Sequence, residues 1–413
     1  MRGRTKDSPV HTSDLVGLKK VPSGTEFSNR LRSLELFVGA GGLALGAARA
    51  GFHSLAVLDS DNRSCETLRS NKRNSVAHVR DWEILEEDVG DFDFSKYAEI
   101  DLLSGGPPCQ PFSQGGKRDG RSDARDMLPH FIRAVRECQP KTFLIENVKG
   151  LLHRSFVDYF SYVIHQLRFP QVSRKKGERW TEHRARLERL YTSGKFTGIK
   201  YNVIWQVLNA ANFGVAQRRE RVFVVGVRAD LSIEYSFPVQ THSREALWFD
   251  QWTTGTYWER HGIAKSRRPE VPESVSRILL RSDPCQLLKP WQTVRDAIAD
   301  LPKIALGKTS RKVANHFLNP GARTYKGHEG SHMDEPSKTI KAGHHGVSGG
   351  ENAIRLDDET VRYFSVRECA RLQAFPDDWA FDGSWCNCMR QIGNAVPVTL
   401  AEVVTLPLAE VLS

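Results

Sequence analysis

Near its N-terminus the chain reads Ser33-Leu34-Glu35-Leu36-Phe37-Val38-Gly39-Ala40-Gly41-Gly42-Leu43-Ala44-Leu45-Gly46. An apolar run, a glycine-rich turn and an alanine-rich segment follow one another here, which predicts a strand over residues 33–37, a tight turn and a helix reaching about Ala50. A second apolar run, at residues 54–58, ends on Asp59. The order predicts a βαβ unit with an acid at the tip of its second strand, where a carboxylate can bind ribose hydroxyls.

The spacing of the glycines indicates which class of cofactor this turn could bind. Gly39-Ala40-Gly41-Gly42 suits nucleoside cofactors in general, because glycine lets a ligand approach the backbone closely. The turn lacks the Gly-x-Gly-x-x-Gly spacing of dinucleotide sites and the Lys-Ser/Thr end of a phosphate-binding loop. NAD and ATP are therefore disfavoured, and S-adenosylmethionine stays open.

Outward from this unit, strand-like runs recur at residues 100–105, 141–145, 202–207 and 221–227, and helical periodicity marks residues 127–138. Alternating strands and helices predict a mostly parallel sheet flanked by helices, so the fold class is α/β. Residues 1–32 are polar and basic and are expected to form a flexible tail. A charged insert occupies about 170–200, and the alternation ends after about Asp230, where we expect a second domain.

Composition sets the broad class of the protein. The chain has 413 residues, of which 39% are hydrophobic, and a formal net charge of +10, which favours a polyanionic partner such as nucleic acid. No run approaches the about 18 apolar residues that span a bilayer, and no secretory signal follows Met1. Seven scattered cysteines predict a reducing compartment rather than disulfides. No metal is expected, because Cys386-Asn387-Cys388 and His344-His345 lack a four-ligand spacing.

A stiff segment carries one of these cysteines. Gly106-Pro107-Pro108-Cys109-Gln110-Pro111-Phe112-Ser113 follows the run at 100–105, so it would leave the sheet at the carboxyl end of a strand, where α/β sheets bind ligands. Taken alone, Cys109 is either a rigidly held nucleophile or a buried structural cysteine beside a turn. The segment by itself leaves both readings open.

Four segments occur in a fixed order along the chain: Pro107-Pro108-Cys109-Gln110, Ile145-Glu146-Asn147-Val148, Gln217-Arg218-Arg219-Glu220-Arg221 and Gln391-Ile392-Gly393-Asn394-Ala395-Val396-Pro397. Together they resemble the DNA (cytosine-5) methyltransferase family of restriction-modification type, from about Leu34 to Ala401. The resemblance implies a Rossmann-like S-adenosylmethionine-dependent methyltransferase domain with a mostly parallel sheet, plus a smaller, irregular target recognition domain.

The family's chemistry gives these residue types a reason to occur together. Cytosine C5 is too weak a nucleophile to take a sulfonium methyl directly, so a thiolate first adds to C6. Cys109 matches that thiolate, and Glu146 matches the carboxyl that protonates or hydrogen-bonds N3. By resemblance Arg221 contacts the cytosine O2 and positions Glu146, and Arg219 supports the thiolate. Plain alternatives are a surface acid for Glu146 and ion pairs with Glu220 for the arginines.

The resemblance also implies ligand contacts. The expected S-adenosylmethionine contacts are Phe37, Gly39, Gly41, Gly42, Asp59, Asp88, Val89, Pro108, Leu128, Asn394 and Ala395. Ser60 departs from the family, where a large apolar residue packs against adenine. The expected DNA contacts are Gln110, Ser113 and Thr339. Because Asn394 returns to the cofactor, residues 33–232 and 386–413 form a discontinuous catalytic domain, and residues 233–385 form the target recognition domain and its bracing segment.

The resulting hypothesis is sequence-specific methylation of C5 on a flipped-out cytosine in double-stranded DNA, protecting host DNA in a restriction-modification system. We expect a cytoplasmic, nucleoid-associated prokaryotic monomer, acting alongside a cognate restriction endonuclease without a stable complex or a membrane. A tRNA cytosine-5 methyltransferase is an alternative, although the Cys-Phe-Thr signature of such relatives is not found. A non-catalytic DNA-binding relative is a further alternative, disfavoured because Cys109, Glu146, Arg219 and Arg221 are all present.

Overall fold

The computed structural model describes residues 30–413 apart from 109–125, 282–287, 325, 327–328 and 343–351. Cys109, Gln110 and Ser113 therefore lie outside the described residues. Residues 31–413 form one compact unit, which contains all the elements below. The division into catalytic and recognition domains stays a prediction from the sequence.

A seven-stranded sheet forms the centre of this unit, with the order β3-β2-β1-β4-β5-β7-β6. Its strands are β1 (Arg32–Leu36), β2 (His53–Asp59), β3 (Glu83–Glu86), β4 (Leu102–Gly105), β5 (Thr142–Val148), β6 (Tyr201–Asn209) and β7 (Glu220–Arg228). All neighbouring pairs are parallel except those of β7, which runs antiparallel to both β5 and β6. The mostly parallel α/β sheet predicted from the sequence is thus confirmed.

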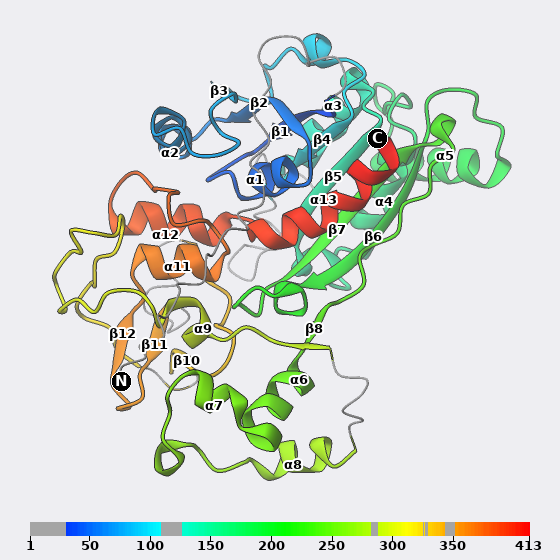
Figure 1. Cartoon of the computed structure of the whole chain (residues 1–413). Coiled ribbons are helices and arrows are strands. Elements are labelled where there is room, and N and C mark those ends of the chain that lie inside the picture. Colours follow the sequence, from blue (N-terminus) through cyan, green and yellow to red (C-terminus); the bar gives the residue numbers. More distant parts are fainter. Residues whose placement is uncertain (1–29, 109–125, 282–287, 325, 327–328, 343–351) are drawn as a thin grey trace, which may run out of the picture. The chain divides into compact units, whose positions relative to one another are not determined.

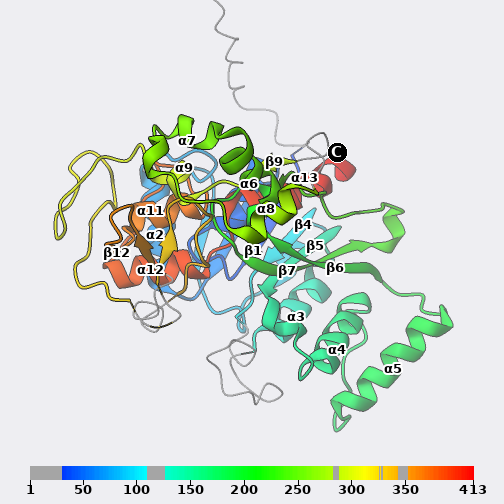
Figure 2. The same ribbon diagram turned by 90° about the horizontal axis from the view of Figure 1, so that it is seen from below.

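Helices cover both faces of this sheet, because strands of a parallel sheet are apolar on both sides and must be buried on both. The helices of this part are α1 (Gly42–Arg49), α2 (Asn62–Arg73), α3 (Leu128–Cys138), α4 (Val157–Arg168), α5 (Trp180–Ser193) and α13 (Val398–Leu412). One core joins Phe131 of α3 and Phe160 of α4 to the sheet. Another joins α1 and α13 to the opposite face, as Figure 2 shows.

The C-terminal segment packs directly on the start of α1. A Cβ atom placed on Gly42 would lie 2.2 Å from the carbonyl oxygen of Val396, so only glycine allows this approach. The stretch Trp385–Leu412 is long and apolar enough to cross a membrane, but 56% of its most apolar window is buried inside the protein. Leu400, Val404 and Leu408 contribute to the core beside α1, which identifies the stretch as core helix.

Short elements make up the region after β7. They are β8 (His242–Ser243), α6 (Arg244–Trp248), α7 (Thr256–Arg260), α8 (Glu273–Leu279), β9 (Lys289–Pro290), α9 (Val294–Ile298), β10 (Ser331–His332), β11 (Ala353–Arg355), β12 (Val361–Tyr363), α11 (Val366–Leu372) and α12 (Trp385–Asn394). Figure 1 shows α6, α7 and α8 grouped together. Leu247, Tyr257 and Trp258 form a small core of their own there, with Trp291 packed against it.

Candidate active site

Glu146 lies near the carboxyl end of β5, in an almost wholly buried position with 7% of its surface exposed. Its Oε1 atom is 2.9 Å from Nε of Arg221, which enters from β7, the next strand of the sheet. Burial raises the pKa of Glu146, and the charges of Arg221 and Arg219 oppose that rise. A carboxyl whose pKa is raised by burial keeps its proton to higher pH than an exposed one and can donate it to a base.

Arg219 occupies a different environment from Arg221, although the two are separated by a single residue. Its side chain is 1% exposed and donates from Nη1 to the Ile340 carbonyl at 3.1 Å and from Nη2 to the Gly393 carbonyl at 2.8 Å. Burial and the charge of Arg221 lower its pKa well below the usual value. Arg219 therefore ties β7 to two distant segments of the chain, which the sequence did not predict.

The proline-rich segment begins beside Glu146. The Asn147 side chain donates from Nδ2 to the Pro107 carbonyl at 3.1 Å. A Cβ atom on Gly106 would lie 3.4 Å from Oε2 of Glu146, so the backbone passes close to the carboxyl. On the far side of the undescribed residues 109–125, the Met127 N–H donates to the Pro108 carbonyl at 3.4 Å. Both ends of that segment therefore meet next to Glu146.

The glycine turn after β1 has an unusual backbone. Phe37 has a φ of 56°, a left-handed conformation uncommon for residues other than glycine, and this ends β1 one residue before the predicted boundary. Asp59 accepts hydrogen bonds from the N–H groups of Gly39 and Asp61, each at 2.8 Å. Burial raises the pKa of Asp59, and these hydrogen bonds oppose the rise. The carboxylate thus holds the turn to the tip of β2.

The turn leaves room for a ligand. A Cβ atom placed on Gly39 would meet no heavy atom of the described residues within 4 Å, so the backbone faces open space there. Phe37 packs against the core to which Val89 and Leu128 belong, so these three predicted cofactor residues share one hydrophobic core. Asp88 is exposed and accepts from the Gly90 N–H at 2.7 Å. Such an arrangement fits a nucleoside cofactor.

The remaining predicted contacts occupy varied positions. Pro108 is exposed at the edge of the described segment, and Asn394 is exposed at the end of α12. Ala395 is 8% exposed and belongs to the core beside α12. Thr339 donates from its hydroxyl to the Arg218 carbonyl at 2.7 Å. This bond joins the residues just before β7 to the region after β10. Gly41, with a φ of 86°, precedes α1 as its N-cap.

Several buried polar residues beside the site were not predicted from the sequence. Glu35, 2% exposed, accepts from the Ser104 hydroxyl at 3.0 Å and from the Ala44 N–H at the start of α1, and burial raises its pKa to about 8. Gln217 donates to Leu372 and Gln373 and accepts from the Ile340 N–H at 3.0 Å. In the sequence, Glu35 stands out only as a single acidic residue within an apolar strand.

Comparison with known proteins gives a consistent result. The family model described as C-5 cytosine-specific DNA methylase matches residues 31–169 and 181–409. The Type II methyltransferase M.Eco47II of Escherichia coli is 32% identical over 92% of this chain and 79% of its own length. The Type II methyltransferase M.NgoMIV of Neisseria gonorrhoeae is 30% identical over 90% of this chain and 95% of its own length.

Solved structures show the same fold. A putative DNA modification methyltransferase encoded within an Escherichia coli prophage superimposes with a TM-score of 0.54 and 22% identity, covering 92% of this chain and 99% of that one. The Dnmt2 methyltransferase of S. pombe superimposes with a TM-score of 0.52 and 18% identity, covering 93% of this chain and 98% of that one. At these identities the likeness concerns the arrangement of the chain alone.

Proposed function

Because this chain belongs to the C-5 cytosine-specific DNA methylase family, and is therefore a DNA (cytosine-5) methyltransferase, we propose that Glu146 and Cys109 carry its reaction together. The observation that supports this most strongly is the buried carboxyl of Glu146, held by Arg221 beside the start of the segment that leads to Cys109. The buried carboxyl supplies a proton donor beside Gly106, three residues before the expected nucleophile.

In the proposed reaction the Cys109 thiolate forms a bond to C6 of cytosine. The electron pair of the C5–C6 double bond moves toward N3, where the proton of Glu146 meets it. C5 would then be nucleophilic, S-adenosylmethionine would supply the methyl group and leave as S-adenosylhomocysteine, and the N3 proton would return to Glu146. Loss of the C5 proton to a base would expel the Cys109 thiolate and restore the C5–C6 double bond. Arg221 keeps Glu146 in place during these steps, and its remaining N–H groups are available to the cytosine O2.

The cofactor in this proposal is S-adenosylmethionine, which supplies the methyl as an electrophilic sulfonium group. The turn from Phe37 to Gly42 would hold it, with Asp59 toward the ribose and Asp88 toward the adenine amine. The open space over Gly39 supports this assignment. Apolar contact would come from Val89 and Leu128, which belong to the core against which Phe37 packs.

The DNA must present its target cytosine outside the helix, because C5 and C6 are enclosed in the base stack of a duplex. We assign base reading to residues 233–385, where arginines and polar side chains are displayed on short elements, of which α6 and α7 share a small core of their own. Thr339 is assigned to the backbone of the target nucleotide. The matching relatives favour this DNA reading over methylation of tRNA.

The test of the nucleophile is transfer of labelled methyl groups from S-adenosylmethionine to duplex DNA. A Cys109→Ser protein should lose transfer, whereas Cys386→Ser, a free cysteine away from the proposed site, should keep it. Undiminished transfer by Cys109→Ser would overturn the assignment. Offering tRNA in a parallel reaction separates the two substrate classes, and the proposal predicts incorporation into DNA only.

The biological role is proposed from the Type II methyltransferases among the relatives. Methylation at a short sequence would protect host DNA from a cognate restriction endonuclease, with no stable complex between the two enzymes. The enzyme would act as a monomer in the cytoplasm, in contact with the nucleoid. Digestion of DNA from expressing cells with a panel of restriction endonucleases tests this role, because one recognition sequence should become resistant.

A further inference from the structure

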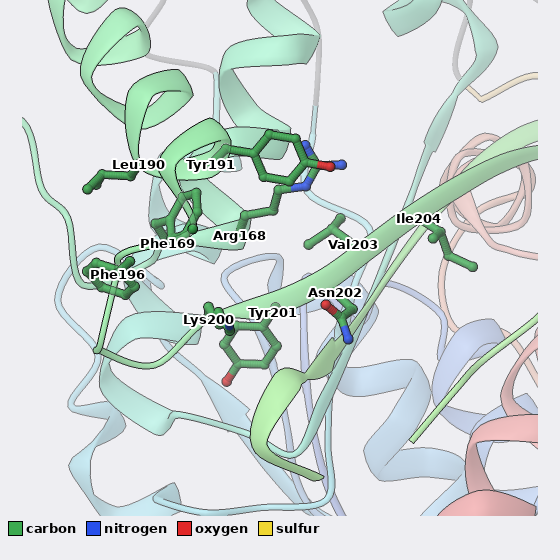
Figure 3. Close-up of a pocket in the computed structure, with 11 residues that line it drawn as sticks. Arg168, Phe169, Leu190, Tyr191, Phe196, Lys200, Tyr201, Asn202, Val203 and Ile204 are labelled. Carbon is green, nitrogen blue, oxygen red and sulfur yellow. The ribbon is translucent and has the colours of Figure 1, made fainter. Parts of the chain in front are cut away.

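A pocket of about 380 Å³ lies at the outer edge of the central sheet, between the end of α4, the end of α5 and the outermost strand β6. Pockets of this volume commonly hold small ligands or single large side chains. Figure 3 shows Arg168 and Tyr191 side by side above Val203, with Ile204 following along the strand. Phe169 and Val203, 5% and 6% exposed, give the pocket an apolar floor.

This pocket is separate from the catalytic residues. Across the sheet, Asn202 at the pocket pairs with Val227, which pairs with Thr142 at the start of β5. Glu146 lies four positions further along β5, in register with Phe223 and Gln206. Four residues of strand cover roughly 13 Å. The pocket therefore lies two strands away from Glu146, and its Asn202 end is the end further from Glu146 along the strands.

The rim of the pocket is basic and partly apolar. The guanidinium of Arg168 stacks on the ring of Tyr191 with 4.5 Å to its centroid, and Lys200 is exposed on the other side. Within the described part of the chain, neither cation forms an ion pair with a carboxylate. Tyr191 and Ile204 keep 54% and 40% of their surfaces exposed. The rim thus offers positive charge and apolar surface together.

The strand beside the pocket has a free edge. In the described sheet β6 is outermost and pairs only with β7, so half of its backbone N–H and C=O groups lack a strand partner. Trp205 adds an indole ring that is 47% exposed. An extended peptide can pair with such an edge through its backbone while a side chain enters a neighbouring pocket.

Side-chain bonds hold α5, one wall of the pocket, against α4 and the segment between the two helices. His183 of α5 bonds through its ring nitrogens to the Tyr162 hydroxyl and to the Val172 carbonyl, both at 2.8 Å. Arg184 of α5 pairs with Asp158 of α4 at 2.9 Å. The family match is interrupted at residues 170–180, directly before α5.

We propose that this pocket and the β6 edge form a docking site for an acidic, extended polypeptide segment that inserts one large apolar side chain beside Tyr191, over Phe169 and Val203. The two cations select the occupant, since they attract carboxylates two positions before and after the apolar residue, which share its face in an extended peptide. A second copy of the chain is disfavoured, because pairing two such edges would bring the Arg168 and Lys200 charges of both copies together.

The test uses calorimetric titration of the full-length protein with the synthetic peptide Ac-Glu-Glu-Val-Phe-Val-Glu-Glu-amide and with forms in which Leu, Tyr or Trp replaces Phe. At least one should bind, and Lys200→Glu or Tyr191→Ala should weaken it at least tenfold. A peptide with Lys in place of Glu should not bind. A peptide with Pro in place of both Val residues should also fail, because proline cannot pair with a strand edge.

Matched controls separate docking from general charge attraction. Lys96→Glu removes the same charge from an exposed lysine elsewhere, and should leave peptide affinity unchanged. Thermal unfolding confirms that each variant is folded. Absence of binding by every acidic peptide, equal binding of the Lys peptide, or unchanged affinity in both pocket variants would overturn the proposal. So would sedimentation showing a wild-type dimer that Lys200→Glu dissociates, since the occupant would then be a second copy.

Discussion

The β5–β7–β6 ladder, meaning the three strands that pair at this side of the sheet, has buried charged side chains at one end and exposed or half-buried ones at the other. At the carboxyl end of β5, Glu146, Arg219 and Arg221 are withdrawn from water and bonded to one another or to backbone carbonyls. At the other end, Lys200 and Arg168 surround an open pocket without a carboxylate partner among the described residues. The same sheet thus supports buried charge with shifted pKa values at one end and free surface charge at the other.

The difference shows why substitution of the same residue type has different effects at the two ends of the ladder. Removing a buried charge leaves its partners unsatisfied in a medium of low dielectric constant, whereas an exposed charge is replaced by water. The comparison therefore predicts a gradient of effects: large at Glu146 and Arg219, moderate at Glu35 and near zero on folding at Lys200. Each prediction below tests one level of it.

The largest effect is expected at Glu146. Glu146→Gln keeps the shape of the side chain but cannot release a proton to N3, so the rate of methyl transfer should fall by about 10²–10⁴. Single-turnover transfer of labelled methyl to duplex DNA measures this. Because burial raises the pKa of Glu146, the wild-type rate should decline as pH rises and the carboxyl loses its proton. A residual rate close to wild type would remove Glu146 from the chemistry.

The next effect concerns the stability of the fold. Arg219→Met leaves the carbonyls of Ile340 and Gly393 without their donor, and should lower the free energy of unfolding by ~2–5 kcal/mol. The matched control is Arg218→Met, which removes an exposed arginine whose ion pair with Glu335 spans 3.3 Å. That control should change the free energy of unfolding by less than about 1 kcal/mol. Equal losses in urea denaturation would contradict the assigned role of Arg219.

A smaller effect, visible only as pH dependence, is expected at Glu35. Burial raises its pKa from 4.5 to about 8, so the folded state holds a proton that the unfolded chain releases above pH 4.5. The stabilisation is complete below the unfolded pKa and is lost as pH rises to about 8, with a slope of up to about 1.4 kcal/mol per pH unit. Glu35→Gln should flatten the pH dependence of thermal unfolding in this window. An unchanged slope would contradict this.

The smallest effect belongs to the pocket end of the ladder. Lys200→Glu should change the free energy of unfolding by no more than about 0.5 kcal/mol, because the side chain is exposed and forms no ion pair with any residue that the structure describes. Urea denaturation beside wild type measures this. A loss as large as that of Arg219→Met would show that the two ends of the ladder do not differ as described.

Much of the fold was predictable, because periodicity and glycine spacing are local properties of the sequence. The strands at 141–145 and 221–227 were predicted within a few residues of β5 and β7. The antiparallel direction of β7 was not, since strand direction depends on connections across the chain. Likewise Phe37 was placed in β1, although its left-handed backbone ends the strand before it.

The site was predictable only in part, for a related reason. Glu146 and Arg221 were singled out by residue type and order, and the structure places them in contact. The bonds of Arg219 to Ile340 and Gly393 join residues more than one hundred positions apart. Gln217 donates to the equally remote carbonyl of Leu372, and Asn147 donates to the carbonyl of Pro107, 40 positions away. Such contacts arise from tertiary packing, and no pattern within one segment reveals them.

The most direct test of the central claim is bisulfite sequencing of DNA from cells that express this chain, beside cells that express Glu146→Gln. The account predicts that cytosines within one short sequence resist conversion in the first sample, and that this resistance is lost or sharply reduced in the second. Complete conversion with the folded wild-type protein present, or equal resistance with Glu146→Gln, would contradict it.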